Sequence, residues 1–210
     1  MHRIAIVLGV VLPLVSSARA DAPPSERVAI DILTVNGTGC PRGSVIVEMS
    51  PDNTWFRVGH SSSYMALVGV GARPTDFRKN CQLNLVIRTP NGMTYAIASV
   101  DHQAFVSLAP GASARHRANF FFSGQPASPL VDHAISDRQQ GEWQATDTFE
   151  DPTLLFAFCN IQPALTLSTE LRAIAGTSDT TTTTSYVSMV WGDEAGSAPT
   201  IYHLVWRHCG

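Results

Sequence analysis

The chain has 210 residues, of which 44% are hydrophobic, so it can form one globular domain and is too apolar for an intrinsically disordered protein. Its 14 Lys and Arg residues are outnumbered by 17 Asp and Glu residues, which gives a formal charge of −3. Affinity for nucleic acid depends mainly on cations that contact phosphates, so this charge balance argues against a nucleic-acid partner.

The first twenty residues have the three-part layout of a secretory signal peptide. A short basic start precedes an apolar run over 4–15, and Ala18 and Ala20 follow in the small-residue pattern that signal peptidase cleaves. The apolar run has 12 residues, whereas a membrane-spanning helix needs about 20. We therefore expect 1–20 to be removed and 21–210 to form a single secreted, extracellular domain without a membrane span.

Four cysteines, Cys40, Cys81, Cys159 and Cys209, lie in the mature part of the chain. An even number of cysteines in an oxidising compartment predicts disulfides, here two. None belongs to a C-x-x-C pair, which removes the spacing typical of zinc ribbons and thioredoxin-like redox sites. Three pairings are possible. We favour Cys40–Cys81 with Cys159–Cys209, because each bridge would tie an early strand to a later one at the same end of a sheet.

Short apolar segments recur along the mature chain, and turn residues separate them. The expected strands cover residues 28–35, 45–49, 55–58, 64–70, 81–88, 93–100, 104–108, 115–122, 165–173, 186–191 and 201–208. The stretch 124–144 is rich in turn residues, and Asp151-Pro152 is compatible with the start of a short helix that ends at Phe158. Many short strands predict an all-β fold, an antiparallel two-sheet β-sandwich of the jelly-roll kind with two disulfides.

Two turn signals predict hairpins between neighbouring strands. Pro90-Asn91-Gly92 follows the segment 81–88, where proline presets φ and Asn-Gly tolerates a positive φ. Pro110-Gly111 lies between the segments 104–108 and 115–122 in the same way. The second segment ends in three consecutive phenylalanines. Successive side chains of a strand point to opposite faces, so we expect two of these rings in the core and one packed under a loop or at an edge.

Five local runs, taken together, resemble one known protein family. They are Gly37–Ser44, Ser50–Asp52, Arg78–Leu85, Ala98–Asp101 and Phe122–Gln125. The family comprises secreted proteins, seen mostly in filamentous fungi and actinobacteria, and is catalogued as a domain of unknown function. The resemblance covers nearly all of 28–209, and it implies secretion and a β-rich fold. It brings no catalytic or ligand-binding residues to transfer.

One of these runs suggests a small cationic binding spot. Arg78 and Lys79 precede Cys81 and an alternating strand, and a cationic pair beside a disulfide can bind a carboxylate or sugar hydroxyls. The alternative is that Arg78 forms an ion pair with Asp76 or Asp101 and simply fixes the loop. We therefore take Asp76, Arg78, Lys79 and Asp101 as candidate ligand-binding residues.

Aromatic side chains are further candidates for binding sugar. Trp143 follows the polar run Gln139-Gln140-Gly141-Glu142, which indicates exposure. Trp191 and Trp206 lie in apolar strands and are expected in the core, where aromatic rings bury a large apolar area. Trp143 is thus the candidate platform on which a sugar ring would stack.

The turn Asn36-Gly37-Thr38 is an N-glycosylation sequon. Its glycine-rich surroundings favour a surface position, so Asn36 is the candidate site of glycan attachment in a host that glycosylates. The alternative is an ordinary turn asparagine.

No established arrangement of catalytic residues is apparent in the sequence. There is no G-x-S-x-G turn to expose a nucleophilic serine. A glycosidase needs two carboxylates about 5–10 Å apart, and Glu48 with Asp52 or Asp101 with Glu170 can be named without any privileged status. The mature histidines form neither H-x-H nor H-E-x-x-H, so we expect no catalytic residues, no cofactor and no metal.

These observations favour a secreted, non-enzymatic module that binds a polysaccharide or an extracellular protein at a cell surface, a cell wall or a host interface. A secreted hydrolase or lyase that acts on polysaccharide is the main alternative, and close carboxylates in a cleft would support it. A structural or defensive exoprotein without a small ligand is the third hypothesis.

Overall fold

The structure is a computed structural model that describes residues 20–136, 139–150, 153–189 and 199–210. These residues form strands and loops without a helix. The strands are β1 (Ile30–Asn36), β2 (Val45–Met49), β3 (Trp55–His60), β4 (Met65–Gly69), β5 (Arg78–Ile87), β6 (Met93–Ser107), β7 (Ser113–Phe122), β8 (Val131–Ile135), β9 (Gln140–Thr148), β10 (Leu165–Ile174), β11 (Thr184–Ser188) and β12 (Thr200–His208). The expected signal peptide lies, up to residue 19, outside the described residues.

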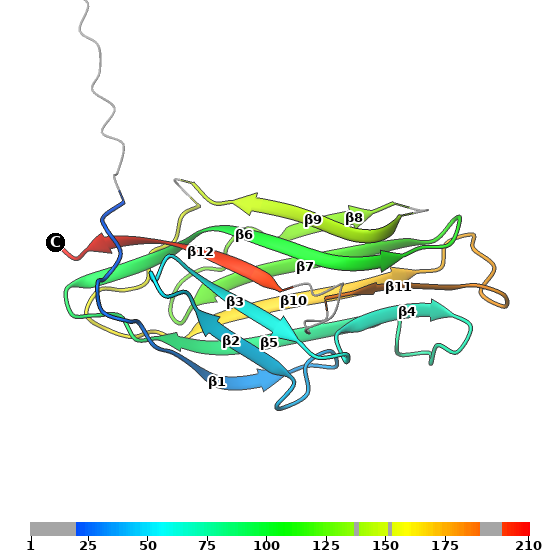
Figure 1. Cartoon of the computed structure of the whole chain (residues 1–210), viewed down its shortest axis with the longest axis horizontal. Helices are drawn as coiled ribbons and strands as arrows, with labels where there is room; N and C mark the ends of the chain where they lie inside the picture. Colours follow the sequence, from blue (N-terminus) through cyan, green and yellow to red (C-terminus); the bar gives the residue numbers. More distant parts are fainter. Residues whose placement is uncertain (1–19, 137–138, 151–152, 190–198) are drawn as a thin grey trace, which may run out of the picture.

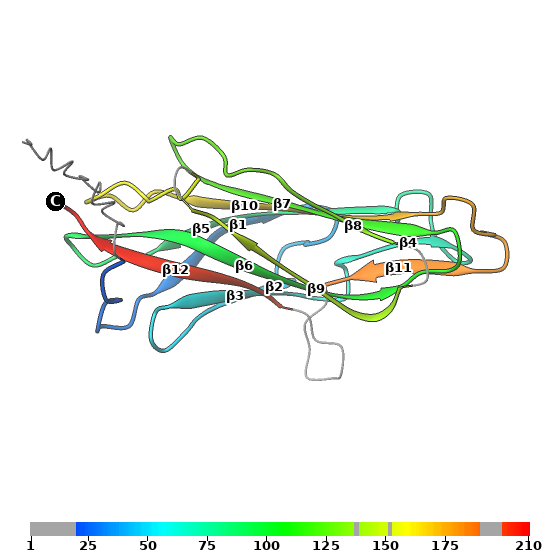
Figure 2. The same cartoon turned by 90° about the horizontal axis from the view of Figure 1, so that it is seen from above.

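The strands build two antiparallel sheets that pack face to face (Figures 1 and 2). The five-stranded sheet has the order β1-β5-β10-β7-β8. The seven-stranded sheet has the order β2-β3-β12-β6-β11-β4, and β9 pairs with β6 off this path. The predicted all-β, two-sheet sandwich is confirmed.

Alternation along each strand explains why the two sheets pack together. In β7 every second side chain is buried and the others are half-exposed. The last two inward residues of β7 are Phe120 and Phe122, which are 2% and 0% exposed. Phe121 between them is half-exposed on the outer face. The two expected core rings are thus confirmed, whereas the third faces outward from β7, which lies between β10 and β8 and is not an edge strand. Across the sandwich, Tyr95 of β6 meets Phe122 edge to face at a centroid distance of 5.4 Å.

The two predicted hairpins do not form. The turn at Pro90-Asn91-Gly92 exists, with a φ of 76° at Gly92, but β5 and β6 on its two sides belong to different sheets. The turn at Gly111 similarly carries the chain from β6 to β7, in the other sheet. Turn residues show that a chain reverses, whereas pairing depends on which sheet the next strand joins, and here each reversal crosses the sandwich.

Three further expectations also differ from the structure. Residues 93–100 and 104–108 were expected as separate strands, but β6 runs unbroken through the polar triplet Asp101-His102-Gln103 because His102 faces the interior. The turn-rich stretch 124–144 contains two edge strands, β8 and the first part of β9. The proposed helix begins at 151–152, outside the described residues, and its described part, up to Phe158, is not helical.

Each sheet contributes an edge strand to one side of the sandwich. β8 forms the end of the five-stranded sheet. β9 pairs along one side of β6, and β11 and β12 pair along the other, since Ser107 and Asp101 each have partners on both sides. A side-chain contact links the two edge strands, in which His133 Nε2 of β8 lies 2.8 Å from Asp147 Oδ2 of β9.

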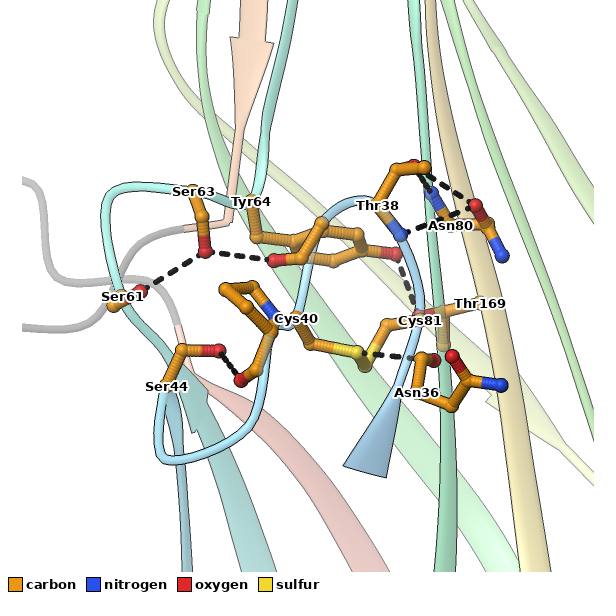
Figure 3. Close-up of a disulfide and its surroundings, with 12 residues drawn as sticks. Asn36, Thr38, Cys40, Ser44, Ser61, Ser63, Tyr64, Asn80, Cys81 and Thr169 are labelled. Atoms are coloured by element: carbon orange, nitrogen blue, oxygen red, sulfur yellow. Dashed lines mark hydrogen bonds between the residues drawn. A yellow bond between two sulfur atoms is a disulfide. The ribbon is translucent and has the colours of Figure 1, made fainter. Parts of the chain in front are cut away.

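Both favoured disulfides are present. Cys40–Cys81 and Cys159–Cys209 join residues 41 and 50 positions apart, with Cα–Cα distances of 5.3 and 5.8 Å. Around the first bridge, Tyr64 lies beneath the loop and donates a hydrogen bond of 2.6 Å to Thr169 of β10 (Figure 3). The loop comes so close to this ring that a Cβ atom on Gly39 would lie 2.2 Å from it.

Candidate functional site

The predicted cationic spot is divided between two networks. Asp76 accepts hydrogen bonds of 2.9 Å from Arg73 Nη2 and Lys79 Nζ, and these donors hold the pKa of its carboxyl well below its usual range. Lys79 is mostly buried in this contact. Arg78 points to the other face of β5 and pairs with Glu170 of β10. Arg78 therefore contacts Glu170, not the Asp76 or Asp101 that the sequence suggested.

Asp101 lies on the outer face of the other sheet. Its carboxylate accepts a hydrogen bond of 2.6 Å from Thr146 of β9 and lies 2.7 Å from Nε2 of His203 of β12. Burial by itself would raise the pKa of Asp101, but the hydrogen bonds from Thr146 and His203 lower it overall. Asp101 thus takes no part in the surface that contains Arg78.

Trp143 is half-buried and not an exposed platform. It occupies an inward position of β9. Its ring lies 5.4 Å from the ring of His133 and 6.0 Å from the ring of His116, centroid to centroid. The polar residues before it suggested exposure because β9 is an edge strand whose alternate side chains face solvent.

The outer face of the five-stranded sheet carries a band of arginines. Arg78, Arg172 and Arg115 stand directly opposite one another on the adjacent strands β5, β10 and β7. Two residues before Arg172 in β10, Glu170 stands opposite Arg117 of β7. The four arginine side chains are 32–49% exposed. We call the four arginines the arginine face.

Two acidic side chains partly neutralise this face. Glu170 contacts Arg78 and Arg172, and burial would raise its pKa, but the hydrogen bonds from the two arginines lower it. Asp132 of β8 bonds Arg115 and Arg117 in the same way, at 2.5 and 3.1 Å. Four cations against two anions leave a net charge of +2 on this face of a chain whose formal charge is −3. Each guanidinium has five N–H donors, so these ion pairs leave donors directed at solvent.

Between the sheets lies a group of three histidines, which we call the histidine cluster: His102 of β6, His116 of β7 and His133 of β8. His116 and His133 stand directly opposite each other in the β7–β8 pair. His102 comes from the facing sheet, and its ring centroid lies 4.5 Å from that of His116. One possible ligand nitrogen from each ring lies within 4.8 Å of the others.

Asp147 of β9 adds a carboxylate to the cluster. Its Oδ2 lies 2.8 Å from His133 Nε2 in a hydrogen bond and 3.2 Å from His102 Nε2 without hydrogen-bond geometry. Among the described residues, neither ring nitrogen of His102 or of His116 has a hydrogen-bond partner. His102 and His116 are 1% and 0% exposed, whereas the side chains of His133 and Asp147 are 25% and 23% exposed.

Burial controls the protonation of the inner histidines. It lowers the pKa of His102 to about 4, and the Asp147 carboxylate offsets only part of this effect. It also lowers the pKa of His116 well below its usual range, and the nearby His102 and His133 lower it further. Both inner rings are therefore neutral near pH 7, the form in which imidazole binds metal ions.

Sequence reasoning did not single out the histidine cluster, because its members come from three strands in two sheets and have no characteristic spacing. One signal was present for His116. In the expected strand 115–122 it shares a face with Ala118, Phe120 and Phe122, which predicts an inward histidine. Nothing comparable marked His133, whose strand was not expected.

The carboxylates considered for hydrolysis are engaged in other contacts. Asp101 and Glu170 lie on the outer faces of different sheets. Glu48 forms an ion pair with Arg57, and Asp52 accepts hydrogen bonds from Thr54. Hydrogen bonds from Ser50 and Thr54 lower the pKa of Asp52, which is the opposite of what a general acid requires.

None of the segments that the structure describes is a helix of the length and hydrophobicity that a membrane crossing requires.

Comparison with known proteins finds a sequence relative and several structural likenesses, among them a carbohydrate-binding module and a phage tailspike domain. An uncharacterized secreted protein of Arthroderma benhamiae is 26% identical over 190 residues, which are 90% of this chain and 75% of the relative. The carbohydrate-binding module TmCBM61, solved in complex with beta-1,4-galactotriose, has a TM-score of 0.31 and 6% identity, covering 88% of this chain and 90% of the other. The active domain of bacteriophage CBA120 tailspike protein 4 has a TM-score of 0.25 and 10% identity, covering 84% and 19%. Neither structural likeness is close enough to assign a function.

The chain also matches a family of secreted proteins along most of its length. The protein is secreted, as its relative is, and carries two disulfides. The match begins at residue 26, before β1, and ends at residue 209, after β12, so it takes in the whole sandwich. The chain belongs to the family described as Domain of unknown function (DUF4360), matched over residues 26–209.

Proposed function

We propose that the protein is a secreted, non-enzymatic binding module whose ligand is an acidic polysaccharide, held on the arginine face. The observation that carries the proposal is the row of Arg78, Arg172 and Arg115 on three adjacent strands. Like charges directly opposite each other in a sheet are destabilising. Two bridging carboxylates offset only part of this repulsion, and a ligand with repeated negative charges would offset the rest.

The geometry of the face suits an extended anionic chain. Neighbouring strands lie about 4.8 Å apart, so the row presents three guanidinium groups at regular short intervals. A guanidinium can bind a carboxylate or sulfate through two parallel hydrogen bonds. Beside the arginines, the outward positions hold amide and hydroxyl side chains that can bond sugar hydroxyls: Asn80, Gln82, Asn119 and Ser168.

The same features favour a polysaccharide over a protein as the ligand. Protein interfaces generally have an apolar, aromatic core. The central rows of this face are made of charged, amide and hydroxyl side chains. The one outward phenylalanine of β7, Phe121, is only half-exposed. Hydrolysis is disfavoured because Glu170, the acid in the centre of the face, has a lowered pKa and pairs with Arg78 and Arg172.

A binding assay with the mature protein tests this function. Residues 21–210, made in an oxidising host, would be titrated with polygalacturonate and, in parallel, with a neutral β-glucan, while released reducing sugar is measured. We expect salt-sensitive binding of polygalacturonate, weak binding of the neutral glucan and no sugar release. Release of sugar would instead support the hydrolase alternative.

Substitutions of single arginines test whether the polysaccharide binds on the arginine face. Arg172→Gln and Arg115→Gln should each weaken binding about five- to ten-fold, since a hydrogen bond to a charged group contributes about 1.5–3 kcal/mol before screening by solvent. Arg57→Gln is the matched control, because Arg57 is a similarly exposed arginine that pairs with Glu48 in the other sheet. Equal binding by all three variants would refute the assignment to the arginine face.

A further inference from the structure

We propose that the histidine cluster, together with Asp147, is a binding site for one divalent transition-metal ion, and that Zn²⁺ is the ion its ligands fit. The inference does not depend on polysaccharide binding, because the arginine face points outward and the histidine cluster points inward. It rests on the orphaned nitrogens, on the distances, on the type of ligand atoms and on the access to solvent.

The orphaned nitrogens are the first argument. His102 and His116 are buried, and all four of their ring nitrogens lack a hydrogen-bond partner among the described residues. A buried polar group without a partner is destabilising, and structures rarely keep several together without a bound ligand or water. Coordination would engage one nitrogen of each ring. The two rings come from facing sheets with centroids 4.5 Å apart, and one ring nitrogen of each lies within 4.8 Å of the other.

The distances are close to those of a metal site. Nitrogens that bind a tetrahedral zinc ion at about 2.0–2.1 Å lie about 3.4 Å from one another. The candidate nitrogens of the cluster lie within 4.8 Å of one another. The longest separation therefore needs to shorten by at most about 1.4 Å, which small side-chain rotations of three residues can supply without any movement of the strands.

The ligand atoms select the class of ion. Three imidazole nitrogens with one carboxylate oxygen form a tetrahedral set of the type that zinc accepts, whereas calcium and magnesium prefer sites made entirely of oxygen. Asp147 already lies within 3.2 Å of both His102 Nε2 and His133 Nε2. It can therefore act as the fourth ligand, and its negative charge partly compensates for that of the cation.

The site is reachable from one side. His133 and Asp147 come from the edge strands β8 and β9, and their side chains are 25% and 23% exposed, while His102 and His116 form the closed floor. An ion can thus enter between the two edges. Trp143 stands beside the cluster at 5.4 Å from the ring of His133, so its fluorescence can report binding.

The first experiment measures metal binding directly. Mature protein would be freed of metal with a chelator and titrated with ZnCl₂ by calorimetry, with CaCl₂ as the hard-cation comparison. We expect one Zn²⁺ per chain and no binding of Ca²⁺. Replacement by Co²⁺ should produce the intense visible absorption of a tetrahedral cobalt complex with nitrogen and oxygen ligands. Absence of stoichiometric zinc binding by the folded wild-type protein would overturn the proposal.

The second experiment locates the ion. His133→Gln and Asp147→Asn alter the two partly exposed members, so they disturb the core least. Loss of a residue that only hydrogen-bonds to a metal ligand typically weakens metal affinity about 10–100-fold. Loss of a ligand itself in His133→Gln should therefore weaken zinc affinity at least about 100-fold. The matched control is His203→Gln, because His203 forms the same kind of contact, 2.7 Å to Asp101, on the outer face.

The outcomes separate a metal site from a merely structural cluster. Near-ultraviolet circular dichroism of each metal-free variant shows whether it is folded before zinc is added. A folded His133→Gln that binds zinc as tightly as wild type would refute the assignment. Loss of zinc affinity in His133→Gln and Asp147→Asn, with wild-type affinity in His203→Gln, would establish it. Equal loss in all three would place zinc elsewhere and also refute it.

Discussion

Lowering the pH from 7 to 5 should markedly destabilise the metal-free protein, because three buried histidines are neutral in the folded state. Burial lowers the pKa of His60 and that of His102 to about 4, and lowers that of His116 well below its usual range. In the unfolded chain each imidazole titrates near 6.5. Between these values the unfolded state binds more protons than the folded state.

The sign and the size follow from this difference. When the unfolded state binds more protons, stability rises with pH, so it is present above pH 6.5 and lost as the pH falls towards 4. For a folded pKa of about 4, the free energy of unfolding falls by about 2 kcal/mol per histidine between pH 7 and pH 5. His60 and His102 together contribute about 4 kcal/mol, and His116 acts in the same direction. Domains are typically stable by 5–15 kcal/mol, so the loss is large.

Urea denaturation with a chelator present, at pH 7, 6 and 5, measures the effect. Carboxylates should contribute little in this window, because acids such as Glu170 and Asp101 have lowered pKa values and titrate at lower pH. His60→Leu removes one buried imidazole and should remove part of the pH dependence. A free energy of unfolding that changes by less than about 1 kcal/mol between pH 7 and 5 would refute burial as the cause.

Three further predictions concern the covalent structure and the loops. The double variant Cys159→Ser/Cys209→Ser opens a loop of 50 residues and should lower the free energy of unfolding by about 4 kcal/mol in urea titrations. Gly39→Ala should lower the melting temperature, because the added methyl would lie 2.2 Å from the ring of Tyr64, with a cost of about 1–3 kcal/mol. In a host that glycosylates, mass spectrometry should find a glycan that Asn36→Gln removes, because Asn36 is exposed.

The sequence was sufficient to predict most of the strands, because alternation is a local pattern, and its even number of cysteines predicted two disulfides. Apolar residues alternate in β5 and β7, whereas the edge strands β8 and β9 lie largely in a stretch that is rich in turn residues. The assignment of strands to sheets was not predictable in the same way. The turn at Gly92 reverses the chain, but the partner of β5 on each side is distant in sequence: β1 on one side and β10 on the other. Such pairing is decided by packing across the whole domain.

The binding surfaces were less predictable than the fold. Arg78 was recognised as a candidate, but its companions on the arginine face come from β10 and β7, which only the pairing register brings beside it. His102 lies in a polar triplet that suggested a break between strands, and the triplet is polar because His102 faces the cluster while Asp101 faces His203. A polar interruption in an alternating strand can therefore mark an inward functional group as well as a loop.

Strand β7 connects the two proposed sites and also separates them. Its residues Arg115, His116 and Arg117 are consecutive, and the alternation of a strand sends the arginines outward and the histidine inward. Three consecutive residues of one strand can thus serve two sites with different requirements, a solvated cationic face and a largely buried histidine cluster. The two outer side chains contact Asp132 and the inner one contacts the rings of the cluster, so substitutions of the arginines should affect the proposed polysaccharide binding and leave the proposed zinc ligands in place. Substitutions on the outward side of β7 therefore test the polysaccharide proposal, and substitutions on its inward side test the metal proposal.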